Sequence, residues 1–327
     1  MDFLKADQLF WLSGAQERLR QAAAAGRLPH SLLLLSVAGL GVESLAQWTT
    51  AFALCDSVGR RPCGTCVSCL LLTADSHPDA LTVRLEEDAK QIGVDQVRAV
   101  IETLMLKSYC GGYKVAVIEG AENLNVNGAN AFLKTLEEPT QNTLLILTAK
   151  PSHRLPATVA SRCLRFSLRA PAHDAARAWL AQHAGADKNW DAALALAGGA
   201  PLLAAEIEAG GLVELEADMR ESLRQLSAGA IDITLLAERW ARSNPVLRLI
   251  WLENWITARV RASLAGADSL QNVEQVRLPA ALLKHKICQL FELLDATRQF
   301  RRLASTGMNQ QLALENLLVA GLAALSQ

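Results

Sequence analysis

Four cysteines lie within fifteen residues of this chain, at Cys55, Cys63, Cys66 and Cys69. Their spacing, with seven and then twice two residues between them, places four soft sulfur ligands in one short loop. Zinc bound by four thiolates is structural, because no coordination position is left open for a reaction. The sequence therefore predicts a zinc module at residues 55–69. Four unconnected thiols are the alternative, and His77 is a competing ligand, although His77-Pro78-Asp79 is more typical of a turn.

A glycine-rich loop at residues 36–44 falls between a predicted strand and a predicted helix, the setting of a phosphate-binding P-loop. On the pattern G-x-x-x-x-G-K-[ST], Gly41 takes the second glycine position and Gly39 lies inside the loop. Val42 replaces the lysine that reaches the phosphates, and Glu43 replaces the hydroxyl that binds magnesium. Valine brings no charge and a carboxylate repels phosphate oxygens. The loop is predicted to keep its shape without binding ATP; a register shifted to Ser44 would also lack the lysine.

Composition excludes several classes of protein. An apolar content of 51% excludes general disorder, and a chain of 327 residues suggests two or three domains. Lys plus Arg number 32 against 33 Asp plus Glu, so there is no global basic field for nucleic acid. No run reaches the roughly 20 apolar residues of a membrane span, and the first residues lack a secretory pattern. We therefore expect a cytoplasmic protein, in a reducing compartment where disulfides are disfavoured.

Strands and helices alternate around these residues. Val115–Ile118 and Leu144–Thr148 are short apolar runs typical of buried parallel strands, and a helix is predicted over 130–138, ending before Pro139. Strand, helix and strand in this order form a parallel crossover, which residues 159–166 complete. Further predicted elements are helices over 16–25 and 45–54, strands over 32–35 and 81–83, and a helix with Asp95 as N-cap.

Three short motifs carry a resemblance to a known family. They are Leu28-Pro29-His30, the run N-A-F-L-K-T-L-E-E-P that ends at Pro139, and Ser161-Arg162-Cys163. In this order the chain resembles the AAA+ ATPase core of DNA polymerase clamp loaders, and bacterial members of that family carry a similar zinc module. His30 is expected to be a structural histidine.

The resemblance implies roles for four more positions. AAA+ ATPases carry an Asp-Glu pair at the end of the strand at 115–118, where this chain has Glu119-Gly120, and Gly120 cannot polarise a water molecule. Thr148 occupies the position of a polar residue near the γ-phosphate. Arg162 matches an arginine finger that acts on the ATP site of a neighbouring subunit. The alternative for Arg162 is an ion pair with a local carboxylate such as Glu137.

The resemblance also implies the domain organisation and the partners. It predicts an α/β AAA+ base domain with a parallel sheet and zinc module (1–167), a small helical lid (168–210) and an all-α collar (211–327). Pro201 opens the last lid helix without the arginine of ATP-binding members. The implied function is that of a stator without ATPase activity of its own, within the DNA polymerase III holoenzyme, a nucleotidyltransferase. Its implied partners are the gamma/tau and delta subunits, and primed DNA and the sliding clamp through the complex.

Three other functions remain open from the sequence. The chain could be an ATP-hydrolysing motor subunit of the same family, against which the missing lysine argues. It could be a zinc-dependent nucleic-acid-binding protein, for which affinity for DNA in isolation would be the discriminating observation. It could also be a scaffold without a part in catalysis, against which Arg162 argues.

Overall fold

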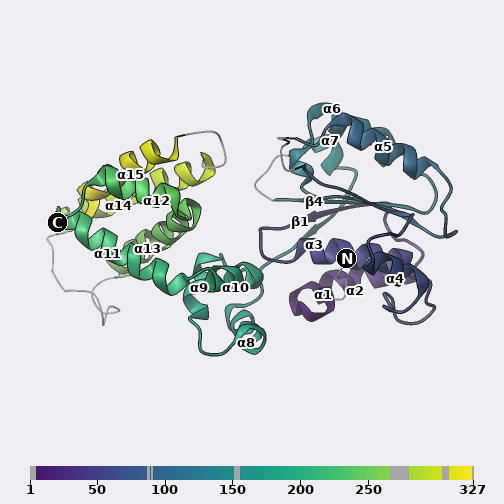
Figure 1. The fold of residues 1–327 in the computed structure, drawn as a ribbon, viewed down its shortest axis with the longest axis horizontal. Helices are drawn as coiled ribbons and strands as arrows, with labels where there is room; N and C mark the ends of the chain where they lie inside the picture. The colour runs from purple at the N-terminus through teal and green to yellow at the C-terminus, as the bar shows by residue number, and fades with distance from the viewer. Residues whose placement is uncertain are drawn as a thin grey trace. The chain divides into compact units, whose positions relative to one another are not determined.

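The computed structural model describes residues 5–86, 89, 91–150, 155–265, 280–303 and 309–325. The chain divides into two compact units. The first consists of Met1–Ala176 together with Ala200–Leu203, and the second of Arg177–Gly199 and Ala204–Gln327. The first unit contains a sheet with helices, and the described part of the second is helical (Figure 1).

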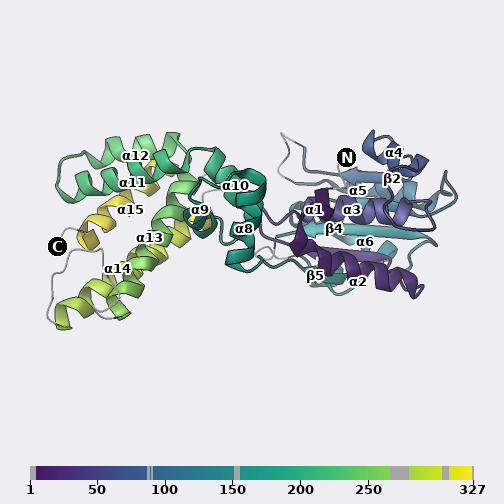
Figure 2. The ribbon, with the colours of Figure 1, turned by 90° about the horizontal axis from the view of Figure 1, so that it is seen from below.

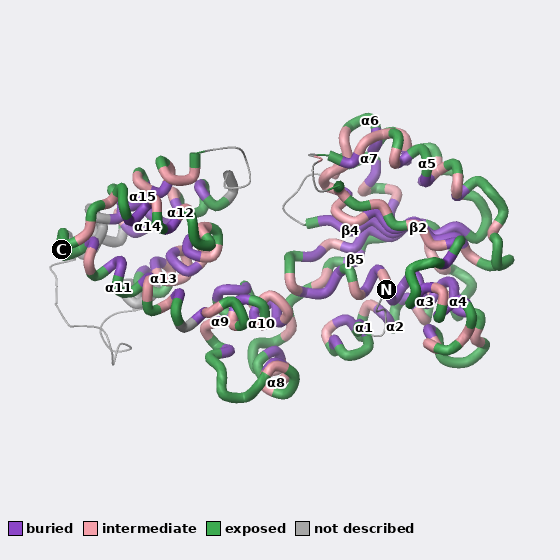
Figure 3. The backbone as a smooth tube through the Cα atoms, in the orientation of Figure 1, coloured by how far each residue is buried: buried purple, intermediate pink, exposed green. Residues whose placement is uncertain are grey.

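A parallel sheet forms the centre of the first unit. Its strands lie in the order β2-β3-β4-β1-β5, and every neighbouring pair is parallel. All residues of β3 and β4 are buried, as Figure 3 shows, because helices cover both faces of the sheet. The strands are β1 (Ser31–Leu35), β2 (Ala80–Val83), β3 (Lys114–Ile118), β4 (Thr143–Ala149) and β5 (Leu164–Ser167).

Helices lie on both faces of the sheet (Figures 1 and 2). One face carries α5 (Val94–Met105), α6 (Val126–Glu137) and α7 (Ala157–Ala160), with Phe132 and Leu136 of α6 in the core against Leu145 and Leu147 of β4. The other face carries α1 (Lys5–Gln8), η1 (Phe10–Leu12), α2 (Ser13–Ala24), α3 (Val42–Leu54) and α4 (Val67–Thr73). The carboxyl end of β1 leads into the glycine loop, and the carboxyl end of β3 leads to Glu119 and Gly120.

Four predicted helix starts differ from the structure: α2 and α3 begin three residues before the predicted 16 and 45, and the starts of α6 and α5 differ because of capping side chains. The helix expected from residue 130 begins at Val126, because the Asn125 side chain caps it by accepting the N–H of Gly128 at 2.6 Å. Asp95 is not an N-cap, since α5 begins at Val94 after Gly93, and the Gln96 side chain accepts the N–H of Gly93. The shifts in α6 and α5 come from side-chain bonds at the helix ends, and the apolar faces of the two helices are as expected.

The described residues of the second unit form helices and their connections. They are most of α8 (His173–Ala184) and α10 (Pro201–Ala209), together with α9 (Trp190–Leu196), α11 (Leu212–Ser227), α12 (Ile233–Arg242), α13 (Pro245–Ala265), α14 (Ala280–Leu303) and α15 (Gln310–Leu325). Within the described residues, no single helix is long and apolar enough to cross a membrane. One bent pair, α9 with α10, passes that test by length and composition only.

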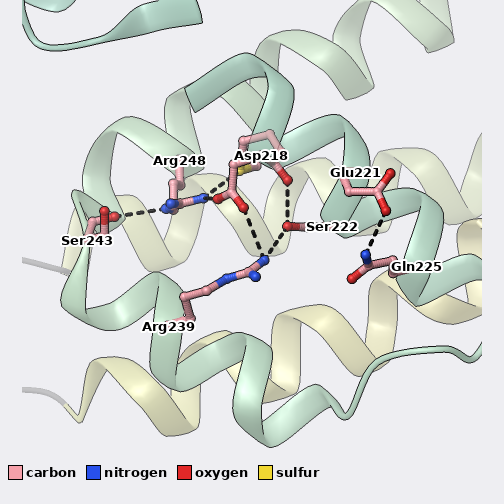
Figure 4. Close-up of polar contacts among 8 residues, drawn as sticks. Asp218, Glu221, Ser222, Gln225, Arg239, Ser243 and Arg248 are labelled. Atoms are coloured by element: carbon pink, nitrogen blue, oxygen red, sulfur yellow. Dashed lines mark hydrogen bonds and ion pairs between the residues drawn. The ribbon is translucent and has the colours of Figure 1, made fainter. Parts of the chain in front are cut away.

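An ion network around the buried Arg248 ties α11 to α12 and α13 in this unit (Figure 4). Asp218 of α11 binds Arg248 of α13 at 2.5 Å through one carboxylate oxygen and Arg239 of α12 at 3.2 Å through the other. The Arg248 side chain is only 6% exposed, and its Nε donates to the backbone oxygen of Ser243. Asp218 therefore compensates a guanidinium that has lost most of its water.

Replacing Asp218 with alanine is expected to lower the free energy of unfolding of the helical unit by about 2–4 kcal/mol, because a buried arginine is left without its carboxylate. Urea unfolding followed by circular dichroism measures this change. Glu221→Ala is the matched control, since Glu221 lies on the same helix but pairs with Arg224 at the surface. Equal losses in the two variants would contradict a special role for the ion network.

Candidate functional site

The four cysteines form a single cluster in the structure. Their sulfur atoms all lie within 4.8 Å of one another, with 3.9 Å between Cys55 and Cys66 and 4.0 Å between Cys63 and Cys69. A tetrahedron with metal–sulfur bonds of about 2.3 Å has edges of about 3.8 Å. Cys55 follows α3, Cys63 and Cys66 come from the loop, and Cys69 lies in the first turn of α4. The four-cysteine group can therefore hold a metal ion, and its geometry is compatible with zinc.

The surroundings of the sulfur atoms also fit a cation. Backbone N–H groups of Thr65 and Cys66 donate to Cys63 and lower the pKa of its thiol to about 6, so a thiolate is available near neutral pH. Burial raises the pKa of Cys55 and of Cys69. Buried thiolates need a compensating positive charge, which a divalent metal provides. The donor set thus fits the group that the sequence predicts.

His77 does not belong to the cluster. Its Nδ1 accepts the backbone N–H of Asp79 at 3.1 Å, and its backbone oxygen accepts the N–H of Ala80 at the start of β2. Because Nδ1 is an acceptor, the neutral ring carries its hydrogen on Nε2. Burial lowers the pKa of His77, which keeps the ring neutral. His77 therefore shapes the turn into β2, as its Pro-Asp sequence predicts.

The glycine loop connects β1 to α3 in the expected order, but residues from other parts of the first unit pack against its glycines. Gly39 and Gly41 have φ of +80° and +76°, which side-chain-bearing residues rarely adopt. A Cβ atom on Gly39 would lie 2.3 Å from the Cβ of Leu203, and the N–H of Leu202 donates to the Gly39 oxygen at 3.1 Å. The side chain of Leu202 also lies against Gly41. Residues at the start of α10 thus occupy the space beside the loop.

The N-terminal segment covers the same loop from another side. The indole nitrogen of Trp11 donates to the oxygen of Leu40 at 3.0 Å. Leu9 approaches Gly41 so closely that an added Cβ would lie 2.7 Å from its side chain. Val42 opens α3 and is buried, whereas Glu43 is exposed in its first turn. The loop therefore has apolar neighbours at its glycines.

The structure brings Glu119 and Glu43 to the same end of the sheet. Burial raises the pKa of Glu119, the ion pair with Arg84 at 3.0 Å opposes that shift, and the charge of Glu43 adds to it. Gly120 adopts φ of +68° and donates its N–H to the hydroxyl of Thr148 at 3.0 Å. Thr148 therefore lies beside Gly120 at the strand end, as expected for this position. Glycine at 120 allows the left-handed backbone of this turn, and the charged groups near it are Glu119, Glu43 and Arg84.

Arg162 lies where the three short motifs meet. Its Nε donates to Oε1 of Glu137 at 2.9 Å, so the ion pair with a local carboxylate, the alternative to an arginine finger, is present. The hydroxyl of Ser31 donates to the backbone oxygen of Arg162 at 2.8 Å. A ring nitrogen of His30 lies 3.2 Å from the oxygen of Leu136, one residue before Glu137. His30 thus has the structural role expected of it.

Comparison with known proteins places these features in a family. Residues 12–172 match the family model described as "DNA polymerase III, delta subunit", and residues 216–321 match "DNA polymerase III, delta subunit, C terminal". DNA polymerase III subunit delta' of Pseudomonas aeruginosa is 35% identical over 298 residues, which cover 89% of this chain and 90% of that protein. The chain belongs to the delta' family of DNA polymerase III subunits.

Other relatives agree with this assignment. Subunit delta' of Escherichia coli is 32% identical over 314 residues, covering 94% of this chain and 93% of that protein. DNA polymerase III subunit tau/gamma of Haemophilus influenzae is 31% identical over 160 residues, covering 47% of this chain and 23% of that protein. The delta' family and the tau/gamma subunits are thus related, and the α/β fold with a parallel sheet and a helical C-terminal region is as predicted.

Several residues of this delta' family member make contacts that sequence patterns did not predict. Sequence patterns assign no contact to Leu202, Leu203 or Ser31. Their partners are distant in sequence, since Ser31 and Arg162 are separated by 131 positions. The polar residue that opens an apolar strand was the one available signal for Ser31, because a buried hydroxyl needs a partner.

Proposed function

We propose that this chain is the stator of a clamp-loading assembly and takes part in ATP-dependent loading of a sliding clamp onto primed DNA. In this assembly it would contact tau/gamma and delta subunits. Residues 211–327 would serve as the collar that joins subunits, and the zinc module would have a structural role. The relationship to both delta' and tau/gamma proteins supports this choice of partners.

The observation that carries the stator role is the state of the glycine loop. A P-loop holds phosphates through free backbone N–H groups and a lysine. Here Val42 replaces the lysine, and the residues beside Gly39 and Gly41 are Leu203, Leu202 and Leu9. A triphosphate would have to displace apolar side chains and approach Glu43 and Glu119. We infer that the chain neither binds nor hydrolyses ATP, which separates it from a motor subunit.

Within the assembly, Arg162 would act on the ATP bound by a neighbouring subunit. A guanidinium is always charged, and its planar donor fork suits phosphate oxygens. Placed beside the γ-phosphate, it stabilises the charge that develops during phosphoryl transfer. Arg162 lies two residues after the end of α7, and its side chain is 35% exposed. The side chain is thus accessible to a partner while its backbone is fixed.

Calorimetry on the isolated chain with magnesium-ATP is expected to show no binding with a low micromolar Kd, which would correspond to a binding free energy of roughly −8 kcal/mol. Val42→Lys should not create an ATPase, because Glu43, Gly120 and the leucines around the loop remain. Mixing the chain with tau/gamma, delta, clamp, primed DNA and ATP should restore clamp loading that is absent when this chain is omitted. Hydrolysis by the isolated wild type would instead identify a motor subunit, and loading without the chain would remove the stator role.

A further inference from the structure

The ion pair between Glu137 and Arg162 holds the arginine side chain from one side. Glu137 is the last residue of α6, and Arg162 follows the short helix α7. Both Nε and Nη2 of Arg162 donate to the same carboxylate oxygen, Oε1 of Glu137. The pair is accessible, because the Glu137 side chain is 51% exposed and that of Arg162 35%. A single carboxylate oxygen thus binds one edge of the guanidinium.

Residues of the α7 turn hold the guanidinium from the other side. Nη1 donates to the backbone oxygen of Thr158 at 2.8 Å and, more weakly, to the hydroxyl of Ser161 at 3.4 Å. A guanidinium has five N–H groups, and these contacts together with those to Glu137 engage four of them. The direction of the side chain is therefore set within this chain, before any partner arrives, and no acceptor among the described residues binds the fifth N–H group.

The backbones on both sides of the pair are also fixed. Ser31 bonds to the oxygen of Arg162, and the thiol of the buried Cys163 donates to the oxygen of Val159 at 3.3 Å. On the α6 side, His30 contacts the oxygen of Leu136. Ser31 is the first residue of β1, a buried strand of the sheet, and His30 directly precedes it. Glu137 and Arg162 are thus held at a fixed separation by the sheet itself.

We propose that Glu137 is a positioning residue for Arg162, and this rests on the proposed action of Arg162 on a neighbouring ATP. An exposed arginine has many rotamers, and ordering it at an interface lowers affinity for the transition state. Glu137 orders it in advance by binding the Nε edge. Because four N–H groups are already directed by protein acceptors, the remaining donor points in one defined direction. Glu137 itself does not touch the nucleotide.

The test uses the full chain reconstituted with tau/gamma, delta, clamp and primed DNA. Glu137→Ala is expected to lower kcat of the ATPase of the complex roughly three- to tenfold, the usual effect of freeing one long side chain. The KM for ATP and the affinity of the chain for its partners should stay unchanged. Glu137→Gln should retain most of kcat, because its amide oxygen accepts the same hydrogen bonds from Arg162. Glu102→Ala, an exposed carboxylate on α5, is the control and should leave kcat unchanged.

A double-mutant cycle with Arg162→Ala separates this proposal from the proposed function. If Glu137 acts through Arg162, adding Glu137→Ala to Arg162→Ala lowers kcat no further. A low kcat for Arg162→Ala with a wild-type or raised kcat for Glu137→Ala would overturn the role of Glu137 alone. An additive loss in the double variant would also overturn it, since Glu137 would then act by another route. If Arg162→Ala leaves kcat unchanged, Arg162 is not an arginine finger, and the positioning role of Glu137 is contradicted as well.

Discussion

Arg162→Ala should strongly reduce clamp loading and lower, without abolishing, the ATPase activity of the reconstituted complex. An arginine finger contributes on the order of a thousandfold or more to turnover at its own ATP site. If the assembly holds further ATP sites that this arginine does not reach, as the proposed function implies, the total rate should fall less than that of the affected site. Single-turnover hydrolysis with limiting ATP, together with a clamp-loading assay on primed DNA, measures both effects.

Arg162→Lys separates charge from geometry in the same assays. Lysine keeps the positive charge but lacks the planar fork that Glu137 and a phosphate bind, so it should rescue little. Folding, metal content and assembly should be those of the wild type in both variants, because the backbone of residue 162 is held by Ser31. If the alanine variant loads clamps at the wild-type rate, Arg162 is an intramolecular ion-pair partner of Glu137 and has no part in the ATPase cycle.

Cys66→Ser should release zinc from a protein that otherwise carries about one zinc per chain. A structural zinc bound by four ligands has an apparent binding free energy of about 10–16 kcal/mol, so each ligand contributes about 3 kcal/mol, or a hundredfold or more in Kd. Cys66 also caps α4, since its sulfur accepts the N–H of Cys69. Elemental analysis of the reduced protein, with hydrogen exchange over residues 55–73, measures the loss of metal and of local order.

Cys110→Ser is the matched control for the zinc prediction. Cys110 is exposed and lies outside the cluster, so its replacement should leave the metal content unchanged. The helical unit should keep its stability in both variants, because the cluster belongs to the first unit. Wild-type protein that is free of metal and loses no stability on treatment with a chelator would contradict a structural zinc site.

Local patterns in the sequence predicted the strands of the sheet and the cysteine cluster. Runs such as Val115–Ile118 are buried on both faces, so apolar composition alone reports them. The cysteines fall within one short loop, where spacing in the sequence limits spacing in space. Helix ends were less accurate, since the caps at Asn125 and Gly93 depend on side-chain bonds. Sequence patterns therefore predicted which helices and strands form more accurately than the residues at which they begin and end.

The contacts that organise the candidate site could not be predicted in this way. Leu136 and His30 lie 106 positions apart, and Gly39 meets Leu203 from a segment beyond the sheet. No periodicity joins such residues, because folding of the whole unit brings them together. The sequence showed that the lysine was missing from the glycine loop. It did not show that leucines had filled the neighbouring space.

If the chain does not bind ATP, as proposed, the leucines beside the glycine loop would make that loss hard to reverse during evolution. A mutation that restored lysine at Val42 would still face the close contact between Gly39 and Leu203. A smaller residue at 203 would not remove that contact, because it also involves the backbone nitrogen and Cα of residue 203. Under the proposed function, a return to nucleotide binding would therefore need changes at several positions at once. Single substitutions would bring no gain on the way, so descendants of such a subunit would keep its inactive loop.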